Sequence, residues 1–240
     1  MTNAELLQDA FASGRIHGTN VAIAAAGKTL GTAPKATVRN YRVINKGSPV
    51  PAASTVVEAL EDILQNEKNP HLSVINCSLG SKFDVDNPSG RSPMRLAIAQ
   101  AIAKGFLVVA AAGNDKQEIV AQSGNNDADP KTVYPASLPG VLAIGAVDQD
   151  HAQTKFSNFG QPVKLWAPGT MIPKYDFVPG LYQGTSFAAP YVSGIAACIL
   201  AEKHRDEPAA RMTPDQVKKQ LLDWGQKFPN APTLLHNGRK

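Results

Sequence analysis

Residues 184–190 read Gly184-Thr185-Ser186-Phe187-Ala188-Ala189-Pro190 and lead into an apolar run that ends at Leu200. This pattern predicts a helix that begins close to Ser186, with small residues around its first turn. The unpaired N–H groups and the dipole at such a helix end would stabilise a developing oxyanion, which suits a nucleophilic serine. Because serine and threonine also cap helices, the stretch on its own is equally compatible with a structural role.

A second motif offers a base for that serine. His17-Gly18-Thr19-Asn20-Val21-Ala22 leads into small residues that predict a helix from Val21 to Ala26. His17 would stand at the start of this helix with little bulk around its ring, as a general base requires. A histidine at a helix start is also a common structural feature, so the assignment depends on the other motifs.

Two continuous apolar runs predict strands that end in small residues and are buried on both faces. The run from Phe106 to Ala112 is followed by Gly113-Asn114, which would place a carboxamide at the carboxyl edge of a parallel sheet, where ligands bind. The run from Leu72 to Gly80 would offer a strand edge to an extended peptide. An ordinary turn at Asn114 and an ordinary strand exit at Gly80 are the alternatives.

In their order along the chain, these motifs resemble those of the subtilisin-like serine proteases, the subtilase family. The resemblance implies that His17 is the general base, Ser186 the nucleophile and Asn114 the donor to the oxyanion. It lines the substrate cleft with six residues, Ser78, Leu79, Gly80, Ala111, Ala112 and Gly113. Four further stretches follow in the family's order, at 134–136, 143–147, 156–160 and 166–169.

The chain departs from the family at the third member of the catalytic triad. The family's aspartate ends an early strand well before the histidine motif, whereas nothing in residues 1–16 resembles that strand. Residues 3–11 instead predict a short amphipathic helix in which Asp9 is solvated, so a helix and loop would replace the aspartate strand. Asn20 stands where the family motif has a second histidine, and we expect this to change the cleft wall but not proton transfer.

The remaining patterns alternate between strands and helices, which predicts one α/β domain over residues 1–240 with a mostly parallel sheet. Strands are expected at 35–44, 72–78, 106–112 and 141–147. Helices are expected at 54–67, at 94–104, after Ser186 and from Thr213-Pro214 onward. The resemblance implies a three-layer αβα sandwich of the subtilisin type, shortened at its N-terminus.

Composition narrows the range of partners. A hydrophobic content of 43% over 240 residues suits one large globular domain, and the net charge of +4 is scattered. Because no basic patch is interleaved with aromatic residues and no apolar run has the length of a membrane span, we expect neither nucleic acid nor membrane as a partner. The N-terminus lacks a signal sequence, so the chain as written is expected in the cytoplasm, or outside the cell if a prosegment has been removed.

Nothing in the sequence indicates a cofactor. Cys77 and Cys198 fall in an apolar strand and an apolar helix and are expected to be free thiols, and the histidines lack the spacing of metal ligands. The short connection at 27–31 leaves no room for the calcium loop of many subtilases, although weaker calcium binding stays open.

Three functions are compatible with these features. A serine hydrolase acting on peptide or protein substrates would form an acyl-enzyme on Ser186 and would be impaired by the missing aspartate. A peptide cyclase or ligase would use the same Ser–His pair for acyl transfer. A degraded pseudo-protease would serve as a binding or regulatory module. A partner or a separate segment is a candidate source of the missing strand.

Overall fold

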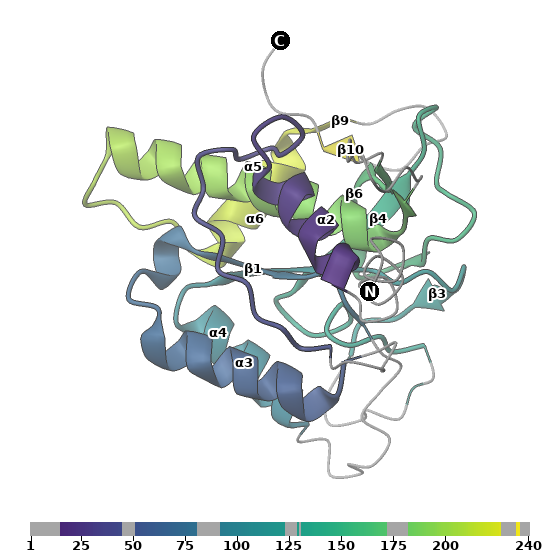
Figure 1. Ribbon diagram of the computed structural model, residues 1–240, viewed down its shortest axis with the longest axis horizontal. Helices are drawn as coiled ribbons and strands as arrows, with labels where there is room; N and C mark the ends of the chain where they lie inside the picture. The colour runs from purple at the N-terminus through teal and green to yellow at the C-terminus, as the bar shows by residue number, and fades with distance from the viewer. Residues whose placement is uncertain are drawn as a thin grey trace, which may run out of the picture.

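The computed structural model describes residues 15–44, 51–80, 92–122, 129, 131–171, 182–226 and 234–235. The helix expected at 3–11, with Asp9, lies outside these residues. Within them, a six-stranded sheet forms a central layer between two layers of helices (Figure 1). The three-layer α/β arrangement inferred from the sequence is therefore confirmed.

The sheet joins strands that are far apart along the chain. Its order is β1 (Val74–Cys77), β2 (Leu107–Ala111), β4 (Leu142–Val147), β6 (Val163–Pro168), β10 (Leu234–Leu235) and β9 (Gly225–Gln226). The first five strands are parallel, and β9 pairs antiparallel to β10. Every residue of β2 and β4 is buried, as a strand covered on both faces requires. The predicted strands at 72–78, 106–112 and 141–147 are confirmed, with their ends shortened by one or two residues.

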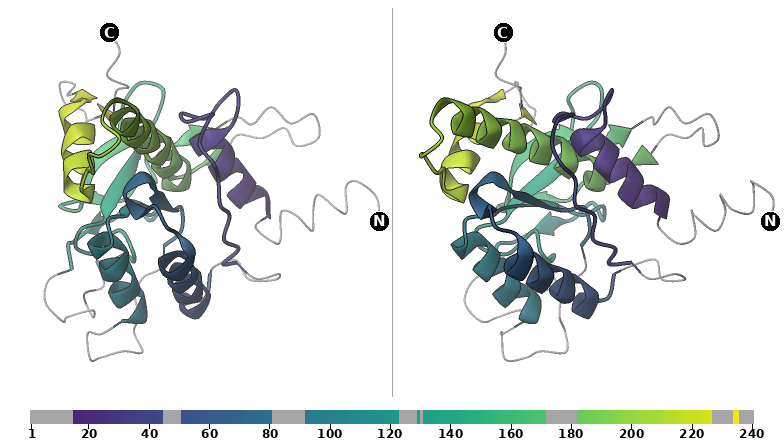
Figure 2. Two further views of the ribbon diagram at one scale, coloured as in Figure 1. Left: turned by 90° about the vertical axis from the view of Figure 1, so that its left-hand side faces the viewer. Right: turned by 60° about the vertical axis from the view of Figure 1, so that its left-hand side comes forward.

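Helices cover both faces of the sheet, as Figure 2 shows from two further directions. On one face lie α3 (Ala53–Asn66) and α4 (Pro93–Ala103); on the other lie α5 (Thr185–Asp206), α6 (Pro214–Asp223) and α2 (Arg15–Ala26), which packs on α5. A separate apolar core fills each side of the sheet. A capping box at Thr213 and a proline at the first turn fix the start of α6.

The strand predicted at 35–44 is wrong, because this segment is irregular. Side chains attach it to α3: Tyr41 Oη donates to Asp62 Oδ2 at 2.9 Å, and Thr55 Oγ1 donates to the carbonyl of Val43 at 3.0 Å. Among the described residues, no strand pairs with this segment or with the outer edge of β1. Since β propensity yields a strand only where a partner completes the ladder, the pattern alone is insufficient here.

Several short elements were not anticipated. A 3₁₀ turn, η1 (Pro70–Leu72), precedes β1. Two small pairs lie outside the main sheet: β3 (Glu118–Ile119) with β5 (Phe159–Gly160), and β7 (Thr170–Met171) with β8 (Tyr182–Gln183). The helix predicted from Val21 begins earlier, at Arg15, so His17 lies within its first turn.

Helix α5 matches a membrane span in length and composition, alone among the described helices and contrary to the sequence-based expectation. Most of that stretch is buried within the fold, against β1, β2, β4 and β6. Its apolar composition is accounted for by this packing, as in the core helix of a folded domain.

Candidate active site

Ser186 is the second residue of α5 and not its cap. The N-cap is Gly184, with φ 156° and ψ 155°, and no side chain caps the helix. This backbone region is open essentially only to glycine. A Cβ at Gly184 would also lie 3.4 Å from Nδ2 of Asn114, so a side chain there would crowd the carboxamide. The capping alternative is thereby removed for both Thr185 and Ser186.

Thr185 holds the carboxamide of Asn114 in one orientation. Oδ1 of Asn114 accepts from the backbone N–H of Thr185 at 2.8 Å and from its hydroxyl at 3.1 Å. The Thr185 hydroxyl in turn accepts from the N–H of Gly113 at 3.1 Å. Because a backbone N–H can only donate, the atom facing it must be the amide oxygen. Nδ2 of Asn114 therefore faces away from Thr185 and donates to no residue of the described ranges.

A buried asparagine braces the turn that carries Asn114. Nδ2 of Asn158 donates to the carbonyl of Ala112 at 2.9 Å, and its Oδ1 accepts from the N–H groups of Asp115 and Gln117 at 3.0 and 3.1 Å. Gly113 has φ +102°, and a Cβ there would collide with Asn158. Sequence reasoning found the stretch around Asn158 without assigning it a role, and it considered Thr185 only as a possible helix cap.

His17 lies beside the first turn of α5. Its half-buried ring is 5.7 Å, centroid to centroid, from the ring of Phe187, the residue that follows Ser186. Burial lowers the pKa of His17, which favours the neutral imidazole that a base requires. No hydrogen bond joins His17 to Ser186 in this conformation, and no carboxylate of the described residues partners the ring.

The six predicted cleft residues occupy the carboxyl ends of β1 and β2. Ser78 is half-buried, Leu79 packs against the core beneath α3 and α4, and Gly80 is exposed. Ala111 and Ala112 are buried, whereas Gly113 is partly accessible. These two strand ends, the start of α2 and the start of α5 thus meet at one edge of the sheet.

Neither cysteine is arranged for catalysis. Neither thiol is in a disulfide, and burial raises the pKa of Cys77 to about 12. Within the part of the chain that the structure describes, no group of three or more His, Cys, Asp or Glu side chains is placed to hold a metal ion.

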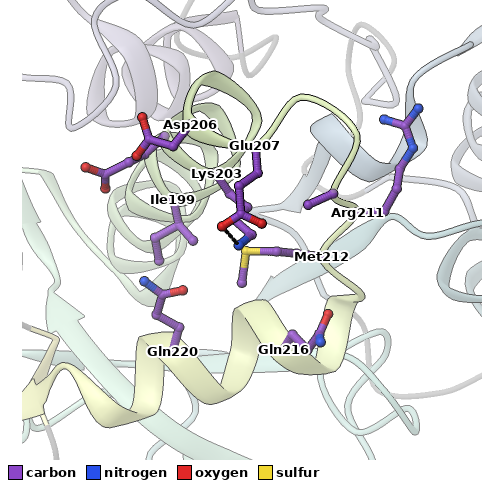
Figure 3. Close-up of a pocket in the computed structure, with 10 residues that line it drawn as sticks. Ile199, Lys203, Asp206, Glu207, Arg211, Met212, Gln216 and Gln220 are labelled. Carbon is purple, nitrogen blue, oxygen red and sulfur yellow. Dashed lines mark hydrogen bonds and ion pairs between the residues drawn. The ribbon is translucent and has the colours of Figure 1, made fainter.

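A hollow of about 620 Å³ lies at the opposite end of α5 from Ser186 (Figure 3). Its wall combines Lys203 of α5 and Glu207, the C-cap of that helix, with Met212 and with Gln216 and Gln220 of α6. Lys203 and Glu207 already pair with each other at 2.6 Å. The hollow includes none of the predicted site residues and is separate from the candidate active site.

Comparison with known proteins agrees with this geometry. The sequence profile of the Subtilase family, Peptidase_S8, matches residues 2–230. Subtilisin DY of Bacillus licheniformis is 36% identical over 198 residues, which cover 79% of this chain and 65% of that protein. Subtilisin amylosacchariticus of Bacillus subtilis subsp. amylosacchariticus is 33% identical over 236 residues, which cover 94% of this chain and 56% of that protein. The chain belongs to the subtilase family.

A solved structure gives the same result for the fold. The crystal structure of a cold-adapted subtilisin-like serine proteinase matches with a TM-score of 0.74 and 28% identity, over 93% of this chain and 75% of that one. The chain spans 65% and 56% of the lengths of the two subtilisins compared above.

Proposed function

We propose that this chain is a serine hydrolase of peptide bonds, with Ser186 as nucleophile, His17 as base and Asn114 as oxyanion donor. The observation that carries the proposal is the fixed orientation of Asn114, whose Oδ1 is held by Thr185 at 2.8 and 3.1 Å. A preorganised donor beside a serine at a helix N-terminus stabilises negative charge without reorganisation during the reaction.

The reaction would proceed by acyl transfer through the serine. Oγ of Ser186 bonds to the scissile carbonyl carbon while its proton passes to His17. The carbonyl oxygen becomes an oxyanion, which accepts from Nδ2 of Asn114 and from the backbone N–H of Ser186 in the first turn of α5. His17 then returns the proton to the departing amine, and water hydrolyses the acyl-enzyme in a second round.

The substrate would be an extended peptide or protein segment. The strand ends at Ser78–Gly80 and Ala111–Gly113 flank the start of α5, so their backbone can pair with a peptide that lies across Ser186. Main-chain pairing would supply affinity, and the sequence preference would depend on the side chains that line the cleft.

The activity of the described residues alone would be weak. His17 lacks a carboxylate partner among them, and in subtilisin the loss of that partner lowers turnover by about 3 × 10⁴. The oxyanion hole and substrate binding would still accelerate the reaction by roughly 10³–10⁴ over the uncatalysed rate. We therefore expect turnover of activated esters and little digestion of folded proteins.

A separate segment or partner would supply the missing strand and its acid. Two observations support this part of the proposal. The outer edge of β1 pairs with no described strand, although β1 is otherwise an ordinary member of the sheet. The subtilisins compared above are also longer, since this chain spans 65% and 56% of them.

A binding or regulatory role is the second candidate. It is favoured by the missing hydrogen bond between His17 and Ser186 and by the absence of a carboxylate at His17 in the described ranges. Acyl transfer to an amine, as in a peptide ligase, would use the same pair of residues and differ only in the acceptor.

Pre-steady-state turnover of a p-nitrophenyl ester separates the acylating candidates, hydrolase and ligase, from the binding role. A hydrolase releases a burst of one p-nitrophenol per chain as Ser186 is acylated, followed by a slower steady rate. Ser186→Ala should abolish the burst, and Ser73→Ala, at the other end of β1, should leave it intact. A wild-type chain that releases p-nitrophenol no faster than Ser186→Ala would support the binding role.

A further inference from the structure

The carbonyl of Ser186 lacks its ordinary helical partner. In an α-helix each carbonyl accepts from the N–H four residues later, and for Ser186 that residue is Pro190. Proline has no N–H, so Pro190 leaves the Ser186 carbonyl without a donor inside the helix. Pro190 is buried, so an acceptor left unpaired there would be costly.

Ser78 provides the missing donor. Its hydroxyl donates to the Ser186 carbonyl at 2.7 Å, which is an optimal O–H···O distance. The two residues are 108 positions apart in sequence. The bond therefore ties the first turn of α5 to the carboxyl end of β1, at the residue that carries the proposed nucleophile.

Asn76, two residues earlier in the chain, sets the direction of the Ser78 hydroxyl. Nδ2 of Asn76 donates to Oγ of Ser78 at 3.0 Å, so the Ser78 proton is left to point at the Ser186 carbonyl. Oδ1 of Asn76 is 2.9 Å from Oγ of Ser193, which lies two turns further along α5. Asn76 and Ser78 are two residues apart in an extended segment, so their side chains lie on the same side of it.

We infer that Ser78 is a positioning residue: its hydroxyl replaces the N–H that Pro190 lacks and so holds Ser186 in place for attack. The inference rests on the proposed function of Ser186. Asn76 and Ser193 keep the Ser78 hydroxyl aligned, and α5 is consequently joined to β1 at two points along its length. Ser78 is also a predicted cleft residue, and the two roles differ in their kinetic signature.

A double-mutant cycle with Pro190 tests this inference. Ser78→Ala should slow ester acylation by roughly 10–10² with KM unchanged, because a displaced nucleophile loses alignment while binding persists. Pro190→Ala restores an N–H for the Ser186 carbonyl, so in that background the effect of Ser78→Ala should shrink to below about threefold. Ser78→Thr, which keeps the hydroxyl, should recover most of the rate.

Ser73→Ala is the matched control. The hydroxyl of Ser73 also donates to a backbone carbonyl, that of Asn69 at 2.9 Å, but at the opposite end of β1. Its loss should leave the acylation rate within about twofold of wild type in either background. A large effect of Ser73→Ala would mean that any weakening of β1 slows the reaction, which would overturn the specific role of Ser78.

Thermal unfolding provides a readout that needs no activity. Ser78→Ala should lower Tm by about 2–6 °C in the wild-type background and by less than half as much beside Pro190→Ala. Equal losses in the two backgrounds would overturn the inference, as would an increase in KM at constant kcat. If the wild-type chain is not acylated at all, the proposed function fails and the positioning role with it. If wild type and Ser78→Ala are acylated equally fast, only the positioning role fails.

Discussion

Thr185 donates twice to the side-chain oxygen of Asn114, from its backbone N–H at 2.8 Å and from its hydroxyl at 3.1 Å. Thr185 immediately precedes Ser186, so one residue connects the proposed oxyanion donor to the proposed nucleophile. The relationship turns an exposed asparagine, which would otherwise rotate freely, into a fixed donor. Its contribution to catalysis is therefore open to a direct test at Thr185 itself.

Thr185→Val removes the hydroxyl while nearly preserving shape. Asn114 would keep the backbone bond but lose the second donor, and the N–H of Gly113 would lose its acceptor. We expect ester turnover to fall by about tenfold with KM nearly unchanged. Thr132→Val is the matched control, because Thr132 is buried and its hydroxyl has no hydrogen-bond partner in the described part of the chain. Equal activity of wild type and Thr185→Val would show that the Thr185 hydroxyl is not needed to orient Asn114.

Asn114→Asp isolates the donor from the acceptor. The aspartate keeps an oxygen for Thr185 but replaces the Nδ2 donor with a second acceptor, so the oxyanion would meet a negative charge. We expect turnover to fall by about 10²–10³, measured as initial rates with an activated ester. Asn66→Asp, on the exposed face of α3, makes the same change in charge away from the site and should have no such effect. Unchanged turnover in Asn114→Asp would return Asn114 to the status of a turn residue.

The pH dependence of acylation reports on His17. Burial lowers the pKa of His17 below its ordinary value of 6.5, and the base must be neutral to act. The rate should therefore rise with pH and reach half its maximum below pH 6.5. A carboxylate placed beside His17 by a partner would raise the pKa and shift this midpoint upward. A midpoint above pH 7 for the chain alone would contradict the environment described for His17.

Acid also affects folding through the same group, and the two effects need to be separated. Because the pKa of His17 is lower in the folded chain, the unfolded chain binds the proton first, so stability falls as pH falls through this range. Thermal unfolding at each pH identifies conditions in which the chain stays folded. His17→Ala should remove the titration from the rate profile along with most of the activity.

The buried side chain of Asn20 lowers the stability of the fold. It lies one turn after His17 on α2, is fully buried, and neither its Nδ2 nor its Oδ1 has a hydrogen-bond partner among the described residues. Asn20→Leu should therefore raise Tm, by about 2–4 °C, because an unpaired polar group is replaced by an apolar one of similar size. Asn66→Leu should not, since Asn66 is exposed and bonded to Asp62. A lower Tm for Asn20→Leu would mean that the Asn20 amide has a hydrogen-bond partner in the folded chain.

The sequence predicts those parts of the fold that depend on burial. The continuous apolar runs of β2 and β4 and the long apolar stretch of α5 each gave the right element, because burial on all sides leaves a strong pattern. Residues 35–44 have a similar pattern but form no strand, because strand formation depends on a neighbour that their own sequence does not encode.

The candidate site divides in the same way. The motifs around His17, Asn114 and Ser186 could be found in the sequence, since each has a distinctive local pattern. The contacts that orient them could not. Thr185 and Asn114 are 71 residues apart, and Ser78 is 108 residues from Ser186. Only the fold shows that the Ser78 hydroxyl donates to the carbonyl of Ser186, which Pro190 leaves without a donor in the helix.

The central claim is that Ser186 is a nucleophile, and reaction with a fluorophosphonate tests it most directly. Intact-mass analysis should show one adduct per chain, and peptide mapping should place it on Ser186, because the reagent phosphonylates a serine oxygen activated by a base and an oxyanion hole. Ser186→Ala should show no adduct, and Ser73→Ala should react like wild type. Equal mass shifts on treatment of wild type and of Ser186→Ala would contradict the hydrolase and the acyl-transfer proposals alike.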